Sequence, residues 1–459
     1  MPVPRLSILS RAALFVAAFC ATALPAARAA EEITLEEPAT DVRVRQVSTE
    51  VRTSGRLYFN AGNNKTTQQE LSAMAAFRYR ERRLPPAGRD FQSLRALRDF
   101  ELATMQSQVG EHATSVDLPQ QLRGIVVRGG RDGIQCYCPG QLMTREAVDL
   151  LELPGDPLVL TALLPRTPVT PGAQWTAPEW CGQMLSSLEA VSKVELNCRL
   201  ASSDANTAVI EFNGVANGQR YGANSDVTIT GRFVFDRQQN LISKASAKYD
   251  IKSSVGLINP GIDGAIEMTM ERGIAESSGR LTDPVADAIP LEPQPGDLLL
   301  KFAAPPWGVS MSFDRNWYVF QALFEGTPQV AILRLMQQGT HVCQCNLSPI
   351  AAAAPGQHTP IEQFEKDIQQ ALGSKFKQFT SRDRIPTDDG RTILRLVAEG
   401  TMSVAGDQGA VELPTKWIYY LCADRSGKQM SFVFVIEPAY LDMLAGRDLQ
   451  MVKSVRFSR

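Results

Sequence analysis

The chain has 459 residues, of which 44% are hydrophobic and 21% are charged. This balance is typical of a folded globular protein and excludes an intrinsically disordered one, and the length favours two domains. The formal net charge is −2 at pH 7. No predicted element carries a basic stripe, which excludes nucleic acid as a partner because a phosphate backbone requires concentrated positive charge.

The first 29 residues have the order of a secretory signal peptide. Arg5 and Arg11 precede an apolar run over residues 12–24, and the small-residue sequence Ala27-Arg28-Ala29 follows. The run is too short to span a bilayer comfortably, and the chain contains no second hydrophobic segment. We therefore expect cleavage after Ala29 and an extracytoplasmic protein, periplasmic or secreted, with no transmembrane segment in the mature chain.

Apolar and polar residues alternate through residues 30–275. The clearest runs cover residues 77–80 and 227–235. A period of two places one face of each strand on a core and the other face in solvent, which is typical of an antiparallel sheet. Two helices are expected to interrupt the strands, one that Thr144 caps and one over residues 179–191. The sequence therefore predicts a curved antiparallel β-rich domain.

A polar segment rich in Ser, Gly, Pro and Asp at residues 276–295 predicts a linker. Residues 296–459 then predict an α+β domain. Its clearest helix begins at Thr359-Pro360-Ile361-Glu362, which has the pattern of a capping box with proline at the first helical position, and Gly373 ends it. Three strands and a final helix at residues 438–444 complete the domain.

Several features of this second domain occur together in one known family. They are a hairpin about Trp317, the helix sequence Ile361-Glu362-Gln363-Phe364, the strands at 390–395 and 417–421, and the ending at 453–457. In this order they resemble the PsbP-like α/β/α sandwich over residues 298–457. The resemblance implies an accessory or binding module with no catalytic residues. In the first domain, residues 156–175 are similar to a motif of exported bacterial β-rich proteins of unknown function.

Seven cysteines remain after Cys20 leaves with the signal peptide. An oxidising compartment allows disulfides, and an odd count leaves at least one thiol without a partner in the chain. Cys181 in a predicted helix and Cys198 in the following strand form the best local pair. Cys345 and Cys422, on two strands of the second domain, form a further candidate disulfide.

His341, Cys343 and Cys345 alternate along a predicted strand. Odd positions of a regular strand share one face, so an imidazole and two thiols would lie about 7 Å apart. These ligands suit Zn or Cu, with a fourth ligand such as Cys422. The alternative is that both cysteines are ordinary buried strand residues.

No catalytic motif is present, since the chain has three histidines and lacks a Gly-x-Ser-x-Gly elbow, a phosphate loop and a His-Glu-x-x-His sequence. The sequence therefore favours an exported, two-domain, non-catalytic protein without a cofactor, a binding or envelope-assembly module. Another envelope protein and an apolar ligand are its two candidate partners. A second interpretation is a carrier of an apolar ligand, enclosed by Phe77, Tyr79, Phe233 and Phe235 on the concave face of the sheet. A third is a metal-dependent activity at His341, Cys343 and Cys345.

Overall fold

The computed structural model describes residues 31–38, 40–60, 66–85, 90, 93–130, 133–152, 154–406 and 409–458. The predicted signal peptide at 1–29 lies outside the described residues. The described chain is mostly antiparallel β-structure, with 56% strand and 17% helix, arranged in three sheets. None of its helices combines the length and apolar character that a membrane crossing requires.

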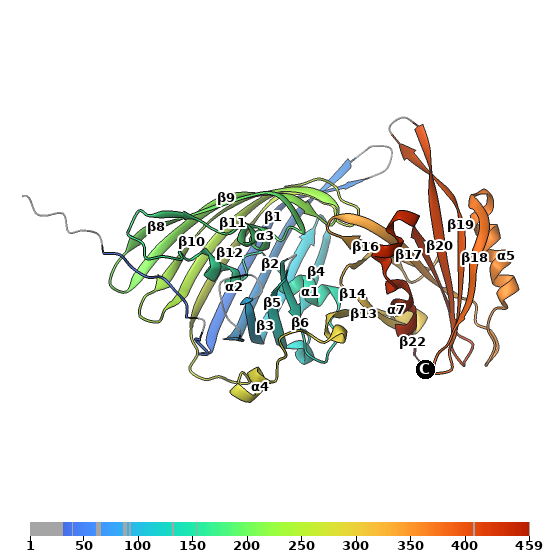
Figure 1. Cartoon of the computed structure of the whole chain (residues 1–459), viewed down its shortest axis with the longest axis horizontal. Helices are drawn as coiled ribbons and strands as arrows, with labels where there is room; N and C mark the ends of the chain where they lie inside the picture. Colours follow the sequence, from blue (N-terminus) through green and yellow to red (C-terminus); the bar gives the residue numbers. More distant parts are fainter. Residues whose placement is uncertain are drawn as a thin grey trace, which may run out of the picture.

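The first sheet has twelve strands in the order β6-β5-β3-β2-β1-β12-β11-β10-β9-β8-β7, and β4 pairs with β3. It curves into a trough of long strands (Figure 1). Its strands are β1 (Arg45–Asn60), β2 (Thr66–Arg83), β3 (Arg95–Val109), β4 (His112–Asp117), β5 (Gly124–Gly130), β6 (Gly133–Tyr137), β7 (Gln174–Thr176), β8 (Ala190–Ser203), β9 (Thr207–Arg220), β10 (Ala223–Asp236), β11 (Leu241–Ser253) and β12 (Gly261–Ile274).

The predicted alternation of this sheet is confirmed, as β10 illustrates. Val227, Ile229 and Phe233 are buried on the inner face, whereas Thr228 and Arg232 are exposed on the outer face. Burial of alternate apolar side chains fixes the register of the strand, because a slip of one residue would expose the whole set.

Three short helices lie inside the trough: α1 (Arg145–Leu151), α2 (Pro157–Leu160) and α3 (Glu179–Ser186). Thr144 caps α1 as predicted, by accepting a hydrogen bond from the backbone N–H of Ala147. The helix predicted at 179–191 ends earlier, because Ser187 adopts a left-handed conformation and β8 begins soon after it. Side chains of α2 share one buried cluster with the four aromatics that the sequence placed on the concave face, Phe77, Tyr79, Phe233 and Phe235.

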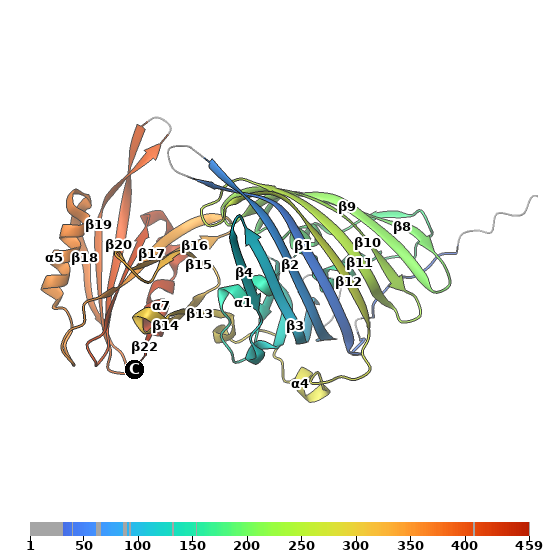
Figure 2. The ribbon, with the colours of Figure 1, turned by 180° about the vertical axis from the view of Figure 1, so that it is seen from behind.

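The segment at 276–295 packs against the outer face of the sheet. It contains α4 (Asp283–Asp287), which lies beneath the lower end of the sheet in both views (Figures 1 and 2). Arg82 forms an ion pair with Asp283 at 2.5 Å and donates a hydrogen bond to the carbonyl of Leu281. Leu281 and Ala286 are buried in a separate cluster on this face. The segment at 276–295 therefore connects the two sheet regions and is packed against the first sheet along its way.

The second sheet region contains two further sheets, in the orders β13-β14-β22 and β15-β16-β17-β21-β20-β19-β18. Their strands are β13 (Leu299–Ala304), β14 (Val309–Asp314), β15 (Trp317–Leu323), β16 (Val330–Gln337), β17 (Thr340–Ile350), β18 (Phe376–Ile385), β19 (Thr392–Gly406), β20 (Gly409–Ala423), β21 (Gln429–Ile436) and β22 (Arg456–Phe457).

Helices cover both faces of the seven-stranded sheet. On one face α5 (Ile361–Leu372) packs Phe364 against Tyr419 of β20. On the other face α6 (Leu441–Leu444) and α7 (Arg447–Ser454) lie beside Tyr420. The expected capping box of α5 is not formed, since Pro360 is the N-cap and no side chain caps the helix. Residues 447–454 form a helix that the sequence did not predict.

The two sheet regions share one hydrophobic core. A single cluster of buried residues runs from the trough through β13 and β14 to the seven-stranded sheet. Met143 forms a parallel bridge with Leu300, and the backbone N–H of Gly140 donates to Asp297 at 2.9 Å. The junction between the regions is therefore a packed interface, and the clefts along it have walls from both sides.

We expect Phe233→Ala to lower the free energy of unfolding by about 3–5 kcal/mol, because the ring is fully buried and its removal leaves a cavity. Urea unfolding followed by circular dichroism measures the change. Arg232→Ala, on the exposed face of the same strand, is the control and should change the free energy by less than about 0.5 kcal/mol. Equal effects of the two substitutions would contradict the assigned faces of β10.

Candidate functional site

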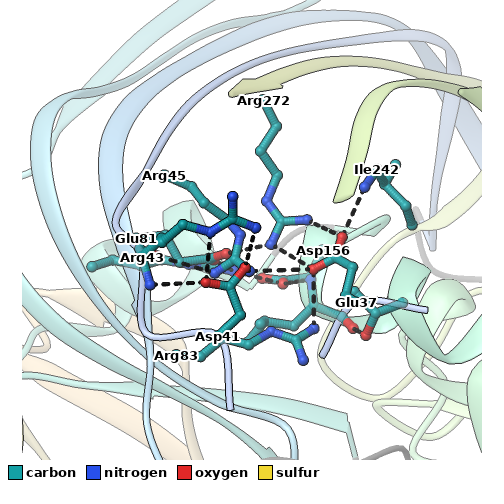
Figure 3. Close-up of polar contacts among 12 residues, drawn as sticks. Glu37, Asp41, Arg43, Arg45, Glu81, Arg83, Asp156, Ile242 and Arg272 are labelled. Carbon is teal, nitrogen blue, oxygen red and sulfur yellow. Dashed lines mark hydrogen bonds and ion pairs between the residues drawn. The ribbon is translucent and has the colours of Figure 1, made fainter. Parts of the chain in front are cut away.

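A buried network of ion pairs occupies the lower end of the inner face (Figure 3). Arg45, Glu81 and Arg98 lie opposite one another on β1, β2 and β3. Arg98 pairs with Glu81 at 2.9 Å and with Asp156 at 2.7 Å, and Arg272 of β12 pairs with Glu81 at 3.4 Å. Asp156 is also the N-cap of α2, so the network anchors this helix to the sheet.

The N-terminal segment supplies the remaining acidic groups of this network. Glu37 pairs with Arg272 at 2.6 Å and with Arg83 at 3.5 Å, and its carboxylate also accepts a hydrogen bond from the backbone N–H of Ile242. Asp41 pairs with Arg45 at 2.8 Å. The segment therefore crosses the inner face and ties β11 and β12 to β1 and β2.

The electrostatics of the network indicate a structural role. Burial alone would raise the pKa of Glu37 and Glu81, but the surrounding arginines, chiefly Arg272 for Glu37 and Arg98 for Glu81, hold both pKa values below the ordinary range. A general acid or base needs a pKa near the working pH. The pKa values of Glu37 and Glu81 are instead lowered, away from neutral pH, so we infer that the network stabilises the fold.

The expected metal site is not assembled on β17. A bulge places Cys343 opposite Leu335 and His341 opposite Met336, so the regular alternation is lost between His341 and Cys343. The two cysteines are buried in the core, whereas His341 is partly exposed. Within the described residues, no group of three or more His, Cys, Asp or Glu side chains could hold a metal ion.

The two expected disulfides are absent, since all seven described cysteines are free and buried. For Cys345 and Cys422 the sheet order is the reason. Strand β21 lies between their strands, and Cys345 is opposite Phe434 whereas Cys422 is opposite Met430. Two strand spacings, about 10 Å, already exceed the Cα separation of about 7 Å that a disulfide tolerates.

Cys181 and Cys198 do face each other where α3 rests on β8, but as free thiols. Burial raises the pKa of both, that of Cys198 to about 12. Neither thiol is therefore a reactive nucleophile at neutral pH.

A polar cleft of about 280 Å³ opens where the two sheet regions meet. Its walls come from α1, the end of α3, and the turns β5–β6, β9–β10, β14–β15 and β16–β17. The polar side chains that define it include Arg145, Glu152, Arg220, Arg315, Gln337 and Gln338. The sequence did not predict this site, because its residues are scattered over turns and helix ends.

Arg315 and Glu152 join the two regions in the wall of the cleft. Arg315 Nη1 lies 3.1 Å from Glu152 Oε1, and its Nη2 donates to the carbonyl of Cys136 at 2.6 Å. Burial raises the pKa of Glu152, and Arg315 offsets this only in part. The ion pair of Arg315 and Glu152 therefore links the two sheet regions.

Two tyrosines face each other across the same junction. The rings of Tyr221 and Tyr318 meet edge to face with centroids 4.8 Å apart. The guanidinium of Arg145 lies 4.3 Å from the centroid of Tyr318, and that of Arg220 lies 5.0 Å from the centroid of Tyr221. Such stacked cation–aromatic pairs are rigid and leave apolar ring surface at a polar site.

Unfavourable backbone conformations are concentrated at this cleft. Five described non-glycine residues have positive φ, and three of them, Ser187, Tyr221 and Gln338, line it. Tyr221 and Gln338 each open a two-residue hairpin turn, at φ 53° and 50°, where Asn, Asp or Gly is favoured. The sequence predicted the Gln338-Gly339 turn, but it did not predict that Gln338 lines a cleft.

Two buried polar atoms of the cleft lack a hydrogen-bond partner among the described residues: Nε of Arg145 and Oε1 of Gln337. Buried polar groups in proteins are nearly always paired, so this donor and this acceptor remain for a water or a ligand group to satisfy.

We expect Glu37→Gln to lower the free energy of unfolding by about 3–5 kcal/mol at pH 7, because it leaves buried arginines without their counter-charge. The folded pKa of Glu37 lies below its unfolded value, about 4.3. Its contribution is therefore present above that pH and is lost as the pH falls through the folded pKa.

Urea unfolding between pH 3 and 7 measures both effects, and the variant should lose less stability than the wild-type protein on acidification. Glu32→Gln, an exposed position of the same segment, is the matched control. A wild-type-like stability of Glu37→Gln would show that the network contributes nothing to the fold.

No protein-family model and no curated protein matches this sequence. Solved structures give distant matches. PsbP from the cyanobacterium Synechocystis is 12% identical, and the match covers 35% of this chain and 92% of that chain with a TM-score of 0.27. Lipovitellin is 11% identical over 52% of this chain and only 26% of that chain, with a TM-score of 0.29. A chain of the MucA/MucB complex of Pseudomonas aeruginosa is 10% identical over 90% and 94%, with a TM-score of 0.15. The expected PsbP-like resemblance therefore extends to a distant structural likeness over part of the chain.

Proposed function

We propose that this chain is an extracytoplasmic, non-catalytic protein that binds a small polar ligand in the cleft between its two sheet regions. The observation that carries the proposal is the clustering of unfavourable backbone conformations at one site. A left-handed residue other than Gly or Asn costs about 1–2 kcal/mol. Three such residues around one cleft suggest that their side chains are kept for recognition.

The chemistry of the lining supports binding over catalysis. Arg315 and Glu152 neutralise each other, and the Arg145 guanidinium donates to the main-chain carbonyl of Trp317 at 3.2 Å. The residues that line the cleft include no histidine or cysteine. Arg220 and Glu189 add one further charge of each sign. The other polar groups of the lining are amides, tyrosines and the hydroxyl of Ser187, which orient a ligand but do not transfer protons at neutral pH.

We also propose that the second sheet region is an α/β/α sandwich of the PsbP-like type. Helix α5 and helix α7 cover opposite faces of its seven-stranded sheet, which supports this assignment. In that arrangement the Trp317 strand lies at the sheet edge next to the cleft. In this proposal the binding role that the resemblance implies belongs to the cleft between the two sheet regions.

A second candidate function is the carriage of an apolar ligand in the upper part of the trough. There the inner-facing side chains of Leu71, Val109, Ile251 and Ile266 remain partly exposed, above the part that α2 fills. A pocket of about 40 Å³ lies at the foot of this strip, beside Phe77. An apolar ligand would therefore contact the upper strip, with Phe77 and Tyr79 at its foot, and not the fully buried Phe233 and Phe235.

We expect Tyr221→Ala to abolish ligand-induced stabilisation while the protein remains folded. A ligand at 100 times its Kd adds about 2.7 kcal/mol of stability, so differential scanning fluorimetry with neutral sugars, amino acids, dicarboxylates, phosphate and polyamines reveals the class that binds. Asn240→Ala is the matched control, since Asn240 has a left-handed φ of 54° and does not line the cleft. Stabilisation that survives Tyr221→Ala would place the ligand elsewhere.

If the trough binds apolar molecules, N-phenyl-1-naphthylamine should fluoresce several-fold more strongly in the presence of the protein. Leu71→Ser should then reduce this signal, because it places a hydroxyl on the inner strip. Ser72→Ala, on the exposed outer face of the same strand, should leave it unchanged. An absent signal, or one that both substitutions leave intact, would remove this second candidate.

A further inference from the structure

The charges around the cleft are balanced. Arg145, Arg220 and Arg315 are matched by three carboxylates, Glu152 and Glu189 in the lining and Asp149, whose Oδ1 lies 3.7 Å from Arg145 Nη1. Asp149 and Glu189 are also among the groups that raise the pKa of Arg220. An ionic ligand would leave one uncompensated charge in a partly desolvated site, which is strongly unfavourable. A neutral ligand avoids this penalty.

The two unpaired buried atoms of the cleft differ in their requirements. Nε of Arg145 can only donate a hydrogen bond, and Oε1 of Gln337 can only accept one. A carboxylate would satisfy Arg145 and leave Gln337 unpaired, and an ammonium group would do the reverse. A hydroxyl group donates and accepts, so a ligand with several hydroxyls satisfies both atoms.

The apolar part of the lining suits the carbon skeleton of such a ligand. Tyr221 and Tyr318 contribute ring surface, and Met184 and Met336 contribute flexible apolar side chains. The volume of about 280 Å³ lies just below the range of about 300–1,000 Å³ for drug-sized ligands. It suits a molecule of one or two small rings.

From this combination of balanced charge, a donor and an acceptor without partners, and tyrosine and methionine surface, we infer that the cleft binds a neutral saccharide of one or two rings. The inference rests on the proposed binding function of the cleft and names its ligand class. Recognition is by hydrogen bonds from Arg145 and to Gln337, with the sugar ring against the tyrosine pair.

Saturation-transfer difference NMR on the chain from residue 30 onward tests the inference, because the method detects weak binding. The probes are glucose, N-acetylglucosamine and maltose for neutral saccharides, glutarate and inorganic phosphate for anions, and spermidine for cations. At least one saccharide should show saturation transfer, with a signal at least five-fold weaker in Gln337→Leu and in Tyr221→Ala. Asn240→Ala should retain the wild-type signal.

The outcomes separate the two proposals. Binding of an anion or of spermidine that depends on Gln337 and Tyr221 would overturn the saccharide inference and leave the proposed binding function standing. Saccharide binding that neither substitution weakens would overturn the placement in the cleft. Binding of no probe would overturn both. If Gln337→Leu does not fold, Gln337→Met replaces it, because Met keeps the length of the side chain and removes the amide oxygen.

Discussion

The insertion of Glu37 among the arginines of the inner face is the interaction on which the rest of the structure depends. Arg45, Arg83, Arg98 and Arg272 lie on four neighbouring strands, and all four are buried. Among the described residues of the sheet, Glu81 alone forms ion pairs with these arginines. The other carboxylates come from outside it, from the N-terminal segment and from the N-cap of α2. The sheet can therefore bury this charge only when both of those segments are docked.

This requirement extends to the cleft. Asp156, which Arg98 holds, follows Glu152 by four residues, so the segment that ends α1 and begins α2 is fixed at both ends. One end lies in the ion-pair network and the other pairs with Arg315 of the second sheet region. Because α1 carries Arg145 into the cleft wall, the position of that wall depends on the ion pairs of Asp156 at the start of α2.

The sequence predicted those features of the fold that depend on residues close to one another in the chain. The alternation of β10 and the cap at Thr144 follow from the chemistry of neighbouring residues alone. The predictions that were wrong depend on how strands distant in the sequence pair with one another. His341 leaves the face of the cysteines because of a bulge that only the register with β16 reveals, and Cys345 is separated from Cys422 because β21 inserts between their strands. The cleft escaped prediction for the same reason, since six elements contribute its walls and only the Gln338-Gly339 turn was visible locally.

The pairing of β1 with β12 has a consequence for how the molecule forms. The two strands pair along 14 residues each, from Arg45 with Ile274 to Tyr58 with Gly261. The first strand of the sheet in the sequence therefore cannot complete its pairing before the last one is synthesised. Contacts between such distant residues must overcome a large loop-closure entropy, and folding that depends on them is slow. If the chain is exported, as we propose, slow closure would leave the polypeptide unfolded long enough to be translocated.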